Sequence, residues 1–208
     1  MQEKTLEYYI AKQKDGHKGT ENYAMTNSGY IKLMNFLQEK IPEAGIILDI
    51  GCNTGYECGM IKTEKRIVIG IDLGEEFITK AKERGVDARV MDMHNLDFAP
   101  GYFDAVYVNN TLEHTYDAVQ ALSEIYRVLK DNGIAIICMP ADCLNMDFVG
   151  GNWDKSLHLW KPTYAQFLNT LKFIGFKFEA EMIDMYEKFG LKNESSNNIY
   201  MVAVCTKL

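Results

Sequence analysis

Two glycines and an asparagine follow an acidic residue in the segment Asp49-Ile-Gly-Cys-Asn-Thr-Gly55 of this 208-residue chain. Glycine lets a backbone approach a ligand closely and adopt a positive φ, and Gly51 and Gly55 supply that freedom. Asn53 stands between them, and asparagine is the non-glycine residue that best tolerates left-handed geometry. A turn of this kind after a buried strand is typical of a site where backbone groups contact a ligand.

Two further acids follow at regular intervals, because Asp72 stands 23 residues after Asp49 and Asp92 stands 20 residues after Asp72. A carboxylate accepts two hydrogen bonds from a vicinal diol, so Asp72 is a candidate to bind a ribose. We expect Asp92 to accept from an adenine amino group, with Leu73, Met91 and Met93 covering the ring. The alternative for each acid alone is a helix cap or a solvated strand end. Three acids and two glycines at successive strand ends favour a nucleotide-like ligand.

Candidates for proton transfer come from the four histidines of the chain. His114 follows the predicted strand 103–108 at the mouth of the sheet, and His158 ends a long irregular stretch over 140–160. Neutral imidazole suits the removal of a proton from a phenol or an enol at neutral pH. The alternative for both residues is a packed or solvated loop histidine. We expect His114 or His158 to be the catalytic base if the acceptor arrives protonated.

An alternation of strands and helices positions these residues. Short apolar runs predict strands over 46–50, 67–71, 87–91, 103–108 and 134–139, with helices between them. Two extended runs, 176–186 and 198–205, finish the chain. This order predicts an α/β fold with a doubly wound, seven-stranded Rossmann-like sheet, mostly parallel with the last strand antiparallel. Ligands of such sheets bind beyond the carboxyl ends of the strands, where the three acids and His114 stand.

Capping signals mark two of the helices. Asp117 is a suitable N-cap for a helix over 117–130, which the glycine at 133 would end. Thr163, with Gln166 three residues later, forms a capping box for a helix that runs to about residue 173.

The expected division of the chain is an N-terminal helical cap segment over residues 1–45 and a ligand-binding domain over residues 46–208. Aromatic residues from the first segment and from the stretch 140–160 are candidates for an apolar pocket and lid, or for ordinary packing. They are Tyr8, Tyr9, Tyr23, Phe148, Trp153 and Trp160.

Charge and composition narrow the class of partner. Lys plus Arg number 22 and Asp plus Glu number 29, a formal net charge of −7, which argues against a nucleic-acid partner. No apolar run approaches membrane-spanning length, and the N-terminus lacks the apolar region of a signal peptide. The five cysteines form no C-x-x-C pair, which indicates free thiols in a reducing compartment. We expect a cytoplasmic protein with a small-molecule substrate and no membrane partner, and the oligomeric state stays open.

The order of these residues resembles the class I S-adenosylmethionine-dependent methyltransferases, particularly the type 11 enzymes. The resemblance rests on residues 48–55, 69–72, 92–93, 103–106, 112–114 and 126–133. It implies S-adenosylmethionine as the cofactor, with the loop 49–55 cradling the methionine part, Asp72 binding the ribose and Asp92 binding adenine. The family usually has glycine where Asn53 stands. The cofactor-binding residues expected on this basis are Asp49, Gly51, Asn53, Gly55, Asp72, Leu73, Asp92, Met93 and Asn109.

A second resemblance, to the ubiquinone-type O-methyltransferases, involves residues 112–114 and 158–167. Those enzymes carry a Glu-x-x-Glu-His metal motif, and Asn110 stands at its first position here. Because one carboxylate ligand is missing, we expect no metal site. The predicted activity is methyl transfer to a small, partly apolar molecule at oxygen.

Other functions stay open at this point. The nicotinamide fingerprint G-x-G-x-x-G requires three glycines, and its places hold Gly51, Asn53 and Tyr56, so an oxidoreductase is a weaker alternative. A catalytically silent protein that binds S-adenosylmethionine or a partner chain would keep the cofactor loop without a base. The Asn/Asp-Pro-Pro-Tyr/Phe signature of amine methyltransferases on nucleic-acid bases is absent after the fourth strand.

Overall fold

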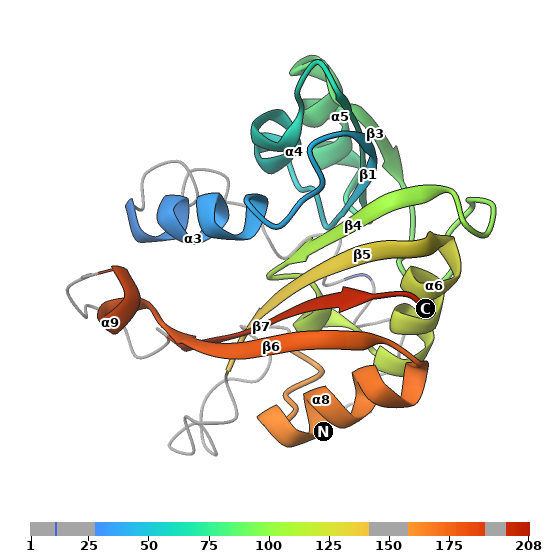
Figure 1. The fold of residues 1–208 in the computed structure, drawn as a ribbon. Helices are drawn as coiled ribbons and strands as arrows, with labels where there is room; N and C mark the ends of the chain where they lie inside the picture. The colour runs from blue at the N-terminus through green and yellow to red at the C-terminus, as the bar shows by residue number, and fades with distance from the viewer. Residues whose placement is uncertain (1–10, 12–27, 142–157, 190–198) are drawn as a thin grey trace, which may run out of the picture.

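The computed structural model describes residues 11, 28–141, 158–189 and 199–208 of the chain. These residues contain a seven-stranded mixed sheet (Figure 1). Its strand order is β3-β2-β1-β4-β5-β7-β6. The first five strands pair in parallel, and β7 runs antiparallel to both of its neighbours. This confirms the predicted doubly wound α/β sheet with an antiparallel last strand. The strands are β1 (Gly45–Ile50), β2 (Arg66–Asp72), β3 (Asp87–Val90), β4 (Phe103–Asn109), β5 (Leu129–Pro140), β6 (Lys177–Asp184) and β7 (Ile199–Thr206).

Helices cover both faces of the sheet and bury two separate apolar clusters. Leu48 and Ile50 of β1 enter the cluster that includes apolar residues of α6 and α8, and Ile47 enters the cluster that includes residues of α3, α4 and α5. A strand buried on both faces carries apolar residues in succession, which is why the first strands read as continuous apolar runs. The helical elements are α3 (Ser28–Gln38), α4 (Tyr56–Ile61), α5 (Glu75–Glu83), the 3₁₀ turn η1 (Leu112–His114), α6 (Ala118–Val128), α8 (Tyr164–Ile174) and α9 (Met185–Phe189). None of the helices in the described ranges is long and apolar enough to cross a bilayer.

The predicted caps form as expected. The Asp117 side chain accepts from the backbone amide of Gln120 at 2.9 Å. Thr163 and Gln166 exchange hydrogen bonds of 2.8 and 3.2 Å, which complete the capping box of α8. Local pairs of this kind are readable from sequence because both partners lie three residues apart.

Several element boundaries differ from the sequence prediction, and β5 begins at Leu129 rather than at residue 134. Helix α6 ends at Val128 rather than at residue 130, because Leu129 is fully buried and pairs with Phe103 of β4. Strand β6 ends at Asp184, where the extended run was predicted to continue to residue 186. The Asp184 side chain accepts from the backbone amide of Glu187 at 3.3 Å and so starts α9.

Several sequence predictions fall outside the described residues. These are residues 1–10 and 12–27 of the predicted N-terminal cap segment, most of the stretch 140–160, and the aromatic residues Tyr8, Tyr9, Tyr23, Phe148 and Trp153. The division into residues 1–45 and 46–208 stays a prediction.

The loop from Gly51 to Gly55 is shaped by the chain around it. Its backbone φ is 77° at Gly51, 48° at Asn53 and 76° at Gly55, which confirms the left-handed geometry expected for Asn53. A Cβ atom at Gly51 would lie 2.1 Å from Oγ1 of Thr111, and one at Gly55 would lie 2.8 Å from a methyl group of Val86. Both glycines are therefore required by packing as well as by conformation.

We expect Gly51→Ala to lower the free energy of unfolding by about 2 kcal/mol or more, because left-handed geometry alone costs an ordinary residue about 1–2 kcal/mol. Gly59→Ala is the matched control. Gly59 is an exposed helical residue of α4 with open space around its Cβ position, so alanine should raise that free energy by about 0.5–1 kcal/mol. Urea denaturation of both variants checks the pair, and a Gly51→Ala variant as stable as the parent protein would contradict the packing argument.

Candidate functional site

The site lies along one edge of the sheet, where the carboxyl ends of parallel strands meet. In the order of the strands from β3 to β4, that edge carries Asp92, Asp72, Gly51 and Asn109. The backbone amide of Met91 donates to the carbonyl of Asp72 at 3.0 Å, so the two acids follow neighbouring paired strands. The structure thus brings the predicted cofactor-binding residues to a common edge.

Asp72 joins the loop after β1 to the start of α5. Its Oδ2 accepts from the backbone amide of Asn53 at 3.1 Å, and its Oδ1 accepts from the amide of Gly74 at 2.9 Å. An ionised carboxylate offers about four acceptor positions, which is sufficient for two amides and a vicinal diol. The donor set therefore fits a ribose beside this side chain. Leu73 follows directly and is half-buried.

Asp92 is held as an ionised acceptor by His94. The backbone amide of His94 and its ring Nδ1 lie 2.9 and 2.5 Å from Oδ1 of Asp92. Burial raises the pKa of Asp92, but the hydrogen bonds from His94 outweigh it and hold the pKa below its usual value. Tyr116, which is exposed, stacks on the His94 ring at 3.7 Å and directs its hydroxyl to Oδ2 of Asp92 at 3.4 Å. Met93 is only 7% exposed and belongs to the apolar core.

Two acids, the buried Asp49 and the half-buried Glu57, lie close to the first loop. Asp49 is 2% exposed, and the Sγ of Cys58 in α4 donates to its Oδ2 at 3.0 Å. Burial, followed by the nearby charge of Glu57, raises the pKa of Asp49 to about 8. Burial also raises the pKa of Glu57. Asp49 therefore points toward α4, and its contact with the methionine part of a cofactor stays a prediction.

Glu57 links three elements that are distant in sequence. It accepts from the hydroxyl of Tyr30 in α3 at 2.9 Å and from Nδ2 of Asn109 at 3.1 and 3.2 Å. Asn109 is 7% exposed and also donates to the Tyr30 hydroxyl at 2.9 Å. Sequence reasoning missed Glu57 and Tyr30. An acid in the first turn of a helix and a tyrosine on an amphipathic helix have ordinary local explanations, and only the tertiary fold reveals their contact.

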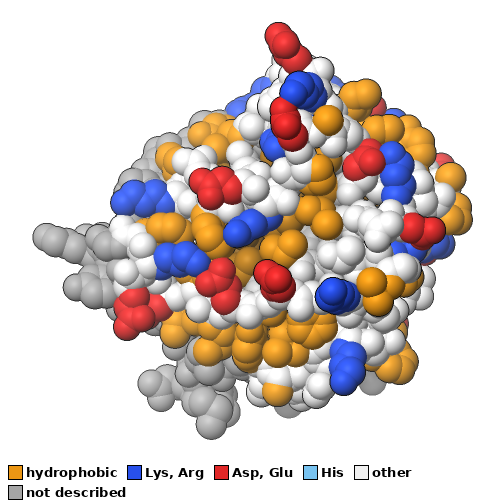
Figure 2. Space-filling model, in the orientation of Figure 1, with side chains coloured by type: hydrophobic (Ala, Val, Ile, Leu, Met, Phe, Trp, Pro, Cys, Tyr) orange, Lys and Arg blue, Asp and Glu red, His pale blue; other side chains and the backbone are white. Residues whose placement is uncertain are grey.

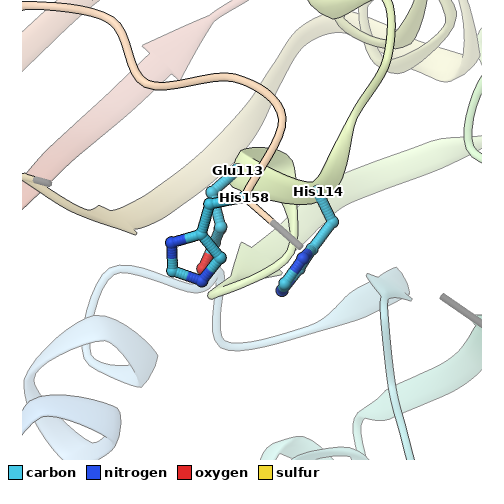
Figure 3. A group of neighbouring side chains, drawn as sticks. All are labelled: Glu113, His114 and His158. Atoms are coloured by element: carbon cyan, nitrogen blue, oxygen red, sulfur yellow. The ribbon is translucent and has the colours of Figure 1, made fainter. Parts of the chain in front are cut away.

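A cluster of Glu113, His114 and His158 lies just beyond β4 (Figure 3). One potential ligand atom of each residue lies within 4.8 Å of the others, and the two imidazole rings are 4.9 Å apart at an interplanar angle of 78°. Glu113 is 2% exposed, and both histidines are half-buried. The backbone amide of Trp160 donates to the carbonyl of Glu113 at 3.0 Å and holds the two segments together. The structure thus brings together two histidines that are distant in the sequence.

Thr111, which precedes the turn that carries Glu113 and His114, connects the cluster to the cofactor loop. This residue lies against Gly51, and its hydroxyl donates to the carbonyl of Asn109 at 3.1 Å. The turn then enters η1, where the amide of His114 donates to the carbonyl of Thr111 at 3.0 Å. One side of the edge offers acceptors for a nucleoside, and the other offers groups for proton transfer or metal binding.

Comparison with known proteins shows what this architecture is similar to. Residues 48–137 match the family described as "Methyltransferase domain". A ubiquinone/menaquinone biosynthesis C-methyltransferase from Desulfotalea psychrophila is 35% identical over 98 residues, which cover 44% of this chain and 40% of that protein. A malonyl-[acyl-carrier protein] O-methyltransferase from Pectobacterium atrosepticum is 30% identical over 98 residues, which cover 46% of this chain and 39% of that protein.

Among solved structures, a SAM-dependent methyltransferase from Thermotoga maritima superposes with a TM-score of 0.77 at 20% identity, covering 96% of this chain and 100% of that one. At this identity the likeness shows the fold. The chain spans about a third to a half of the length of the first curated relatives it matches. The sequence match over β1 to β5, together with the fold, bears out the predicted resemblance: residues 48–137 match a methyltransferase domain, and the sheet has the fold of S-adenosylmethionine-dependent methyltransferases.

Proposed function

We propose that the protein transfers the methyl group of S-adenosylmethionine to the oxygen of a small, partly apolar molecule. The observation that carries this proposal is the histidine pair at the end of β4. The ring centroids of His114 and His158 lie 4.9 Å apart in an edge-to-face arrangement, and the turn that carries His114 follows Thr111, which contacts the cofactor loop. A protonated acceptor requires a group that takes its proton, and these two imidazoles stand where that group is needed.

S-adenosylmethionine supplies a methyl group on a positively charged sulfur. Asp72 binds the ribose hydroxyls, and Asp92, kept ionised by His94, accepts from the adenine amino group. The loop from Gly51 to Gly55 holds the methionine part over the buried Asp49. Alignment of the acceptor with the methyl group and exclusion of water supply much of the catalysis.

The proton and electron balance of the step is simple. The acceptor hydroxyl gives its proton to the histidine pair, and a lone pair of its oxygen forms the new carbon–oxygen bond. The methyl–sulfur bond breaks at the same time, and its electron pair stays on sulfur. A positioned base of this kind contributes about a hundred- to ten-thousandfold in rate.

Charge and the aromatic surroundings support a small acceptor. Lysine and arginine side chains alternate with acidic ones on the face drawn in Figure 2, without the basic stripe that a nucleic acid requires. Trp160, two residues after His158, packs 6.2 Å from Phe167 and offers apolar surface near the pair. The two relatives named above act at carbon and at oxygen by their names, so the acceptor atom is proposed from the histidines. We place the activity in the cytoplasm.

A catalytically silent protein that binds S-adenosylmethionine is the competing function. Such a protein would bind the cofactor at Asp72 and Asp92, but it would not require the histidine pair. Turnover of the cofactor to S-adenosylhomocysteine with any acceptor separates the two functions.

Asp72→Ala should weaken S-adenosylmethionine binding about ten- to a hundredfold, because charge-assisted hydrogen bonds worth about 1.5–3 kcal/mol are lost. Titration calorimetry measures the effect. Asp87→Ala is the matched control, since Asp87 is an exposed acid at the start of β3 that pairs with Arg89, and its affinity should equal that of the parent protein. Tight binding of NAD with no binding of S-adenosylmethionine would refute the cofactor assignment.

Replacement of the histidine that accepts the proton should lower turnover by about a hundredfold or more while cofactor affinity is unchanged. His114→Gln and His158→Gln retain a polar side chain without an imidazole. Labelled cofactor and a panel of phenolic and enolic acceptors measure the rate, and calorimetry measures affinity. Full turnover in both single variants would eliminate the histidine role and favour a nitrogen, carbon or already ionised acceptor.

A further inference from the structure

We propose that Glu113, His114 and His158 bind one divalent transition-metal ion, for which Zn²⁺ is the probe. The inference deepens the proposed function, on which its catalytic part rests. The sequence predicted no metal because Asn110 stands where the ubiquinone-type motif has a carboxylate. In the structure the third ligand comes instead from His158, forty-four residues beyond His114 along the chain.

The geometry of the cluster suits a small ion. One ligand atom from each residue lies within 4.8 Å of the other two. Ligands at about 2.1 Å from a tetrahedral ion are about 3.4 Å apart, so modest side-chain rotations close the remaining gap. Figure 3 shows the Glu113 carboxylate beside the His158 ring, with the His114 ring on the same side of the turn.

The backbone around the cluster holds the ligands close before an ion binds. His114 and Glu113 share the turn η1, which hydrogen bonds from the amides of His114 and Thr115 close at 3.0 and 3.1 Å. The amide of Trp160 donates to Glu113 and so positions the segment that begins at His158. A preformed arrangement reduces the entropy that metal binding must overcome.

The donor set selects the class of ion. Two imidazoles with one carboxylate form the ligand set of catalytic zinc sites, which leave a position open for water or substrate. Mg²⁺ and Ca²⁺ prefer oxygen ligands and fit this set poorly. Glu113 is 2% exposed and offers a carboxylate oxygen beside the half-buried histidines.

Asn110 adopts a different role from the carboxylate of the related motif. Its backbone has φ 49°, and its Nδ2 donates to the Tyr30 hydroxyl and to Oδ1 of Asn109, both at 3.3 Å. This side chain therefore belongs to the network of α3 and β4. The site has three protein ligands, and its open positions are available to the acceptor.

An ion in this position changes how the acceptor loses its proton. As a Lewis acid it lowers the pKa of a coordinated hydroxyl, so the proton leaves to water rather than to a free imidazole. The acceptor oxygen then forms its bond to the methyl carbon, and the electron pair of the broken carbon–sulfur bond stays on sulfur. The three side chains act as ligands that position the ion.

The test begins with direct binding of Zn²⁺ to the full chain after removal of metals with a chelator. Titration calorimetry should give one ion per chain, and the ion should raise the melting temperature by mass action. Glu113→Gln and His158→Ala should each weaken binding by roughly a hundredfold or more. Glu64→Gln makes the same change at an exposed acid before β2, at the opposite edge of the sheet, and should bind as the parent protein does. Circular dichroism verifies that each variant is folded.

The visible spectrum of the Co²⁺-substituted protein gives an independent readout, because nitrogen and oxygen ligands in a four-coordinate site produce intense absorption bands. Loss of these bands in His158→Ala supports the site. Zn²⁺ affinity that is unchanged in both folded variants would overturn it.

Turnover separates this inference from the proposed function. Metal-free protein should still bind S-adenosylmethionine, and its turnover should fall about a hundredfold and return when Zn²⁺ is added. Full turnover without metal would overturn the catalytic role of the ion and support an imidazole base. Metal bound at these residues, with no turnover of any acceptor, would support the site and refute the proposed function.

Discussion

The close approach of the turns after β1 and β4 is the constraint on which the rest of the site depends. Gly51 and Thr111 lie so near each other that no side chain fits at position 51. Parallel pairing of the two strands, with Ile50 opposite Val108, brings their carboxyl ends to the same level. The cofactor loop on one strand and the turn with His114 on the other are therefore positioned by a single contact. A displacement of either turn would move both the residues that accept hydrogen bonds from the nucleoside and the histidines beside the methyl acceptor.

Local signals made much of the fold predictable. The apolar runs gave the positions of the strands, and the caps at Asp117 and Thr163 formed as their spacing indicated. Asn53 adopted the left-handed geometry that its type favours. The end of α6 was not predictable in this way. Leu129 suits a helix as well as a strand, and its burial against β4 decided the outcome.

The parts of the site that sequence reasoning missed depend on long-range contacts. The hydrogen bonds of Tyr30 to Glu57 and of Asn109 to Tyr30 span 27 and 79 positions. His158 meets His114 because the segment before α8 lies at the end of β4, where the amide of Trp160 donates to the carbonyl of Glu113. The residue types were visible in the sequence, but their partners were fixed by topology. An asparagine at position 110 suggested a missing ligand, whereas the fold supplies a histidine from elsewhere.

The two acids close to the cofactor loop, Asp49 and Glu57, couple folding of the domain to the uptake of protons. Asp49 has an ordinary pKa of 3.8, and burial with the charge of Glu57 raises it to about 8 in the folded chain. Between these values the folded state holds more protons than the unfolded state, so the free energy of unfolding falls as pH rises. This contribution is complete below the lower value and is lost as pH rises through the upper one. The pKa of Glu57 shifts in the same direction, so the contribution of both acids to the free energy of unfolding is largest in acidic solution and declines as pH rises toward the pKa of Asp49 in the folded chain.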